Sequence, residues 1–134
     1  MSLALRVLSL VLAVRCLPAE SASTPPAQLF GRIWRVQKGP SHPAAGTIYI
    51  FLSNGTLLET SCVETYRIAH WTTKKDAAGA LDVFEDSQLA FTAKILALTG
   101  SEFRFRQKLV RGKESRDISL KAVASEFVCP DLPK

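Results

Sequence analysis

The sequence predicts an all-β protein, a small antiparallel meander of about eight strands that closes, or nearly closes, into a barrel. The first indication is Asn54-Gly55 between two β-rich runs, because this pair readily adopts the positive φ angles of a tight hairpin turn. The second is residues 102–110, where apolar and charged side chains alternate. The third is the short spacing of the other strand-like runs, because an open meander would expose edges that closure removes.

The expected strands are separated by turn residues such as those at positions 74–79, 85–87 and 99–101. We expect strands over residues 31–37, 47–52, 56–62, 65–73, 80–84, 88–98, 102–110 and 118–123. In the strand at 102–110, one face carries Phe103, Phe105, Gln107 and Leu109, and the other carries Arg104, Arg106 and Lys108. This pattern is typical of a half-buried strand with a basic outer face.

The register of the hairpin depends on the length of its loop. A two-residue turn at Asn54-Gly55 sets Phe51 opposite Leu58 and Tyr49 opposite Thr60. A three-residue loop with a bulge would shift this pairing. We expect the two-residue turn.

An apolar run near the start of the chain indicates a secretory signal peptide. A basic residue precedes the run at residues 7–14, and small residues at 21–23 offer a cleavage site. The run is too short to span a bilayer, which needs about 20 apolar residues. We therefore expect a periplasmic or secreted protein with a signal peptide over 1–23, an extended tether over 24–30 and one β-barrel domain over 31–134.

The cysteines fit an exported chain. Cys16 follows Arg15, whereas a bacterial lipoprotein signal has a small residue there, so we interpret Cys16 as part of the removed leader rather than as a lipid anchor. Cleavage leaves Cys62 and Cys129, and an even pair in an exported domain predicts a disulfide. Two buried free thiols are the alternative.

Aromatic residues at strand spacing form a candidate pocket for a small apolar ligand. Its expected lining is Trp34, Tyr49, Phe51, Phe91, Phe103 and Phe105. The alternative is a solid core, because aromatic residues at this spacing more often fill an interior than line a cavity.

The basic strand is a candidate anion-binding surface formed by Arg104, Arg106 and Lys108. Single-strand nucleic-acid binders interleave such basic residues with stacking aromatic residues on one surface. Here the phenylalanines alternate to the opposite face, which argues against nucleic acid and favours a solvated outer surface. The formal net charge of +5 is only mildly basic.

No catalytic or metal signature stands out. His70 beside Trp71 is the one constellation that resembles a site, and a hydrolase using His70 is the weakest alternative. The chain has no Gly-x-Ser-x-Gly, His-Glu-x-x-His or phosphate-loop motif, and its two histidines lie far apart. We expect a non-enzymatic protein without metal or cofactor, in which His70 belongs to a structural polar patch at the barrel mouth.

Residues 31–71 resemble the META/HslJ-like family. The resemblance is carried by Trp34, by Phe51 before Asn54-Gly55-Thr56-Leu57, and by Cys62 followed four residues later by Tyr66. It implies a small β-rich protein of the bacterial envelope, linked to stress and antibiotic tolerance and without known enzymatic activity. Gly31-Arg32-Ile33-Trp34 is also similar to the Gly-x-Trp signature of lipocalin-like barrels, with one extra residue.

Two binding functions follow from this reading. The first is a stress-related envelope protein that binds a partner protein or an envelope component. The second is a lipocalin-like carrier of a small apolar ligand. A cavity lined by Tyr49, Phe51 and Phe103 would favour the carrier, whereas a solid core with a surface patch would favour the partner-binding protein. Neither function involves nucleic acid or a transmembrane span.

Overall fold

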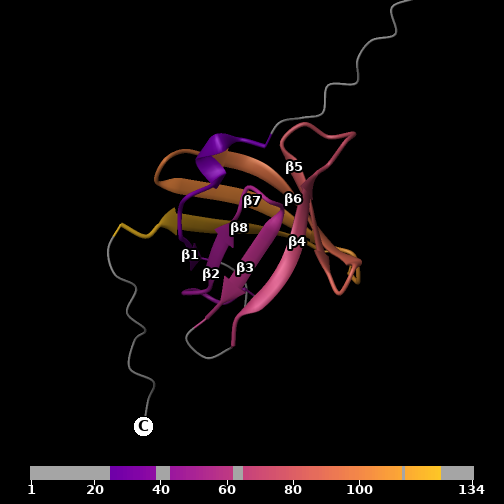
Figure 1. Cartoon of the computed structure of the whole chain (residues 1–134), viewed down its shortest axis with the longest axis horizontal. Coiled ribbons are helices and arrows are strands. Elements are labelled where there is room, and N and C mark those ends of the chain that lie inside the picture. The colour runs from indigo at the N-terminus through magenta and orange to yellow at the C-terminus, as the bar shows by residue number, and fades with distance from the viewer. Residues whose placement is uncertain (1–24, 39–42, 62–64, 113, 125–134) are drawn as a thin grey trace, which may run out of the picture.

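The computed structural model describes residues 25–38, 43–61, 65–112 and 114–124, which form a closed antiparallel barrel (Figure 1). Each strand pairs with the next one along the chain, and the first strand pairs with the last. The elements are a 3-10 turn η1 (Ala27–Leu29) and the strands β1 (Trp34–Lys38), β2 (Ile48–Phe51), β3 (Thr56–Thr60), β4 (Arg67–Thr73), β5 (Ala80–Glu85), β6 (Gln88–Leu98), β7 (Glu102–Leu109) and β8 (Ser115–Ala122).

The expected all-β meander is therefore confirmed, and the largest differences are at the starts of the first and last strands. The first strand begins at Trp34 rather than at residue 31, because Gly31 has a φ of 65° and interrupts the extended backbone. The last strand begins at Ser115 rather than at residue 118, because Asp117 pairs with Arg106 of β7 across the ladder. No helix in the described ranges is long and apolar enough to cross a membrane.

The expected leader and the three cysteines lie outside the described residues. The proposed cleavage site and the Cys62–Cys129 disulfide therefore stay predictions.

The register expected for the hairpin is wrong by one residue. Phe51 pairs with Leu57, and Tyr49 pairs with Glu59. The Gly55 amide donates to the Leu52 carbonyl at 3.1 Å, while the Leu52 amide donates to the Thr56 carbonyl at 2.8 Å. Gly55 has a φ of 86°, so the connection is a three-residue loop whose glycine forms a bulge.

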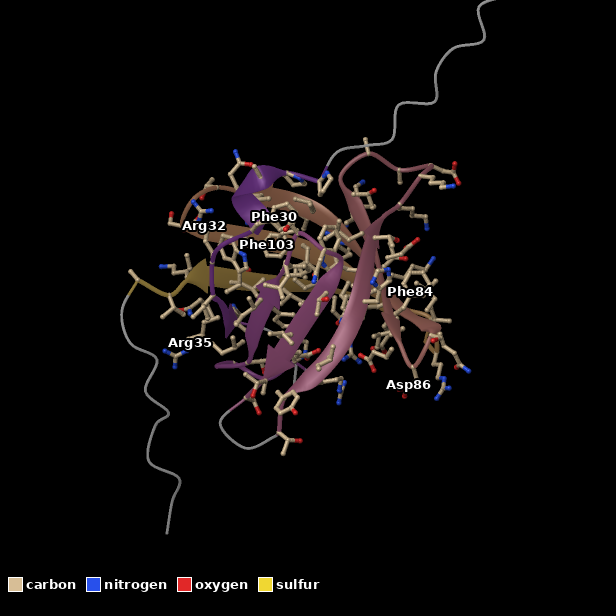
Figure 2. All side chains as sticks on the ribbon, in the orientation of Figure 1. Phe30, Arg32, Arg35, Phe84, Asp86 and Phe103 are labelled. Atoms are coloured by element: carbon tan, nitrogen blue, oxygen red, sulfur yellow. The ribbon has the colours of Figure 1, made fainter. Side chains whose placement is uncertain are left out.

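Aromatic residues fill one end of the barrel, which we call the aromatic end. Phe103 lies inside the barrel (Figure 2), 5.5 Å from Trp34, 5.9 Å from Phe51 and 5.1 Å from Phe105 between ring centroids. All four rings are buried. The turn η1 adds the buried Leu29, whose carbonyl accepts a 3.0 Å hydrogen bond from the Trp34 indole. The interior at this end is a packed core.

Gly55 should be more sensitive to substitution than another glycine of similar backbone conformation. In Gly55→Ala, the new Cβ would lie 2.8 Å from His70 Cε1 and 3.2 Å from the Trp71 carbonyl oxygen. In Gly79→Ala, at a φ of 73°, it would meet nothing within 4 Å. Both variants incur the left-handed conformational cost of about 1–2 kcal/mol, so Gly55→Ala should lose clearly more unfolding free energy in urea titrations.

The double variant Gly55→Ala/His70→Ala provides the control, because it removes the ring that the new methyl group meets. It should recover part of the difference, measured relative to His70→Ala alone. Equal losses for Gly55→Ala and Gly79→Ala would contradict the contact.

Candidate ligand-binding site inside the barrel

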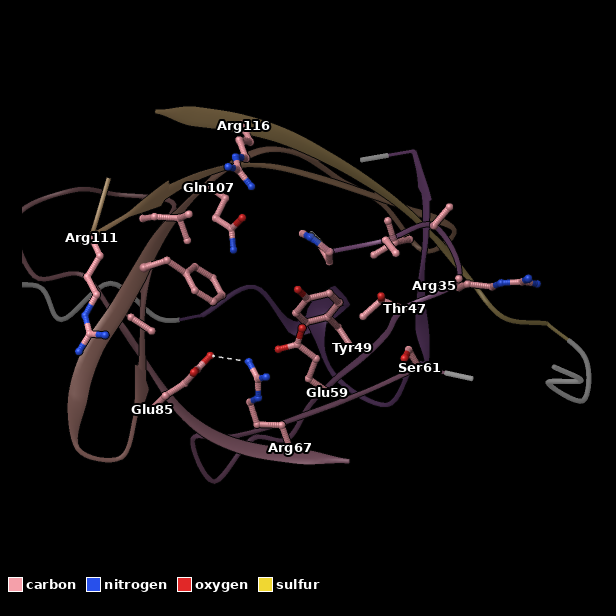
Figure 3. Close-up of a pocket in the computed structure, with 18 of the residues that line it drawn as sticks. Arg35, Thr47, Tyr49, Glu59, Ser61, Arg67, Glu85, Gln107, Arg111 and Arg116 are labelled. Carbon is pink, nitrogen blue, oxygen red and sulfur yellow. Dashed lines mark hydrogen bonds and ion pairs between the residues drawn. The ribbon is translucent and has the colours of Figure 1, made fainter. Parts of the chain in front are cut away.

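A pocket of about 1120 Å³ occupies the other end of the barrel, which we call the pocket end (Figure 3). It lies where β1, β3, β5 and β7 finish and where their partner strands begin. Tyr49 separates it from the aromatic core, with its ring packed edge-on against Phe105 at 6.3 Å. This volume is slightly larger than the roughly 300–1,000 Å³ typical of small-molecule sites.

One side of the pocket is apolar. Phe91 and Leu109 are cross-strand partners on β6 and β7, and both face the cavity. Val36, on the inward face of β1, continues this surface. Together they offer a wall against which a hydrocarbon or ring could be removed from water.

The opposite side carries a charged network from β2 to β5. Tyr49 and Glu59 are register partners on β2 and β3, and both line this side of the pocket. Arg67 Nη1 lies 3.4 Å from Glu85 Oε1, as the dashed line in Figure 3 marks. Burial is the main cause that raises the pKa of Tyr49 well above its usual value of 10.0, and the charge and hydrogen bond of Glu59 add to it.

Two buried polar side chains face the cavity and have no side-chain hydrogen bond to any other residue that the structure describes. Thr47 and Gln107 are 6% and 5% exposed, and both line the pocket. Within the described ranges, neither side chain forms a hydrogen bond. No side-chain nitrogen or oxygen in these ranges is both inaccessible to solvent and without a hydrogen bond. The Thr47 hydroxyl and the Gln107 amide therefore address the space of the pocket, as Figure 3 shows for the amide.

Arginines complete the pocket end. Arg116 is the register partner of Gln107 on β8, and it reaches the cavity from the same side (Figure 3). Arg116 Nη2 also lies 3.4 Å from the exposed carboxylate of Glu114. Arg111 is exposed at the edge of the pocket, while Arg35 points away from the cavity.

The structure separates the six aromatic residues expected to line a pocket. Tyr49 and Phe91 line the cavity. Trp34, Phe51, Phe103 and Phe105 pack together at the aromatic end instead.

The polar lining was missed by sequence reasoning. Gln107 lies on the same face of β7 as the inward-facing Phe103 and Phe105, and this alternation indicates a polar residue inside the barrel. The two-residue turn would set Tyr49 opposite Thr60, and only the observed register sets Glu59 beside Tyr49.

The basic strand faces outward, as its alternation predicts. Arg104, Arg106 and Lys108 are exposed on β7 and away from the pocket. Arg106 is paired with Asp117 through two hydrogen bonds of 2.7 and 2.9 Å, and this contact lowers the pKa of Asp117. Part of the positive charge on this surface is therefore balanced within the sheet.

His70 does not belong to the pocket. It is exposed on the outer face of β4, 6.2 Å from Phe84 between ring centroids, and the expected patch at the barrel mouth is corrected accordingly. Alternation along β4 explains this position, because the neighbouring Trp71 takes the inward place. Among the described residues, no group of three or more His, Cys, Asp or Glu side chains could hold a metal ion.

Comparisons with protein-family models, with curated proteins and with solved structures find no match to this chain. The resemblance to the META/HslJ-like family stays a hypothesis.

Tyr49 should give the protein an alkaline instability. Because its pKa is raised in the folded state, its contribution to stability is complete below the unfolded value near 10 and decreases as the pH rises above it. The Tyr49→Phe variant has no ionisable hydroxyl at this position. Urea unfolding from pH 8 to 11.5 should show wild-type stability falling relative to Tyr49→Phe, by at most about 1.4 kcal/mol per pH unit. Parallel curves for the two proteins would contradict the assignment.

Proposed function

We propose that this protein is an exported, non-enzymatic binding protein of the bacterial envelope, and that it takes an amphipathic small molecule into the pocket end of its barrel. One observation carries the binding function: the cavity combines an apolar wall with two buried polar side chains that have no partner within the described part of the chain. A ligand with an apolar part and a polar part would pack against the apolar wall and form hydrogen bonds with the two polar side chains.

The polar residues argue against the purely apolar ligand that the sequence predicts. A buried polar group without a hydrogen bond costs about 1–3 kcal/mol. A purely apolar molecule would displace water from Thr47 and Gln107 and leave both in that state. A ligand that offers them a donor or an acceptor avoids this cost, so the lining favours an amphipathic molecule.

The binding function is tested by filling the cavity. Leu109→Trp places a larger side chain in the pocket, whereas Val110→Trp changes the next residue, which is 55% exposed and outside the lining. Calorimetric titration with neutral, anionic and cationic dodecyl amphiphiles should find at least one ligand. Its affinity should fall by roughly tenfold or more in Leu109→Trp and stay unchanged in Val110→Trp.

Absence of binding by every amphiphile, or equal binding by both variants, would count against this function. Thermal unfolding of both variants distinguishes a filled pocket from a protein that has failed to fold.

Export is supported by the leader and by the family resemblance. Expression with the native leader in an export-competent bacterium should give an intact mass that matches cleavage near Ser23. The mass should also be two hydrogens lighter than the reduced chain, as a Cys62–Cys129 disulfide requires. An uncleaved, reduced mass would overturn the proposed compartment.

Binding to a partner protein is the second candidate function, and an outward apolar row favours it. Ile50, Leu58 and Ile68 are register neighbours across β2, β3 and β4, and Ile68 is 63% exposed. Tyr66 lies two residues from Ile68 and is also exposed. Ile68→Lys would weaken association with a partner while leaving the pocket unchanged.

A further inference from the structure

We propose that the pocket selects a carboxylate-bearing amphiphile and binds its carboxylate between Gln107 and Arg116. This inference rests on the proposed function and names its ligand class. It follows from the hydrogen-bonding groups that the two neighbouring strands β7 and β8 direct into one part of the cavity.

Gln107 supplies the buried part of this subsite. Its amide is held by the inward face of β7, next to Phe105, so its position is fixed by a rigid strand rather than by a loop. The amide NH₂ can donate two hydrogen bonds. With the side chain 5% exposed and no protein acceptor in the described ranges, those donors are directed at whatever occupies the pocket.

Arg116 supplies the charge. Its position opposite Gln107 in the ladder brings a guanidinium and an amide to the same side of the cavity. The five N–H donors of a guanidinium form a planar fork that can serve more than one acceptor at the same time. A planar carboxylate matches paired donors of this kind and forms stronger hydrogen bonds than a neutral acceptor does.

The acidic residues of the pocket do not form an equivalent site for a cation. Glu59 interacts with Tyr49, its register partner, and Glu85 is paired with Arg67. Each of these two carboxylates therefore already has a polar partner on the same wall of the pocket. The charges across the cavity favour an anion beside β7 and β8.

The apolar wall determines the orientation of the ligand. Leu109 lies two residues beyond Gln107 on the same face of β7, about 7 Å closer to the end of the strand. Phe91, the register partner of Leu109, lies beside it. A carboxylate at Gln107 therefore leaves the hydrocarbon along Phe91 and Leu109, towards the pocket end.

The test compares dodecanoate with its methyl ester, which keeps the chain and removes the charge. Calorimetric titration of the full folded protein at pH 8 should show roughly tenfold tighter binding of dodecanoate. Arg116→Gln and Gln107→Leu should each remove most of this preference while leaving the affinity for the ester unchanged. Arg104→Gln is the matched control, because it makes the same charge change on the outer face of β7.

The outcomes separate this inference from the proposed function. If neither compound binds, the carboxylate subsite is wrong, and the proposed function is wrong as well if the cationic dodecyl amphiphile also fails to bind. If the ester binds as tightly as dodecanoate, or if Arg104→Gln and Arg116→Gln lower dodecanoate affinity equally, the carboxylate subsite is wrong while the binding function stands. Because Gln107→Leu preserves the net charge, its loss of preference would exclude a purely long-range electrostatic effect.

Discussion

Aromatic packing at one end of the barrel determines what the other end can do. Phe103 contacts Trp34, Phe51 and Phe105, and thereby joins β1, β2 and β7 across the interior. An eight-stranded barrel has an interior that side chains can nearly fill. Because the large rings are concentrated at the aromatic end, the remaining space is concentrated at the pocket end. Tyr49 stands at the boundary and belongs to both regions.

The polar lining is compatible with a folded barrel because most of it is paired. Tyr49 with Glu59 and Arg67 with Glu85 connect neighbouring or nearby strands within the wall. Such pairs limit the cost of bringing charges into a partly dry interior. Gln107 and Thr47 differ from them, since their polar atoms face the cavity. That difference separates residues that hold the wall together from residues available to a ligand.

Local patterns predicted the strands well and the site poorly, and the reason is physical. Alternation placed Phe103, Phe105 and Gln107 on one face, because strand side chains repeat every two residues. The same local information cannot show which inward positions share a level of the closed barrel, since that depends on the stagger of all eight strands. Phe91 and Phe103 were therefore grouped together, although one lines the cavity and the other lies in the core. The hairpin failed for a related reason: one extra loop residue moved Glu59 beside Tyr49.

The pairing of the first strand with the last has a consequence for when the cavity exists. Val36 on β1 and Arg116 on β8 both line it, and they lie on strands that meet only when the barrel closes. A chain still being synthesised has no such cavity. Contacts between distant parts of a sequence are also slow to form. Any molecule found inside the purified protein was therefore acquired as the barrel closed or afterwards, and never by the unfolded chain.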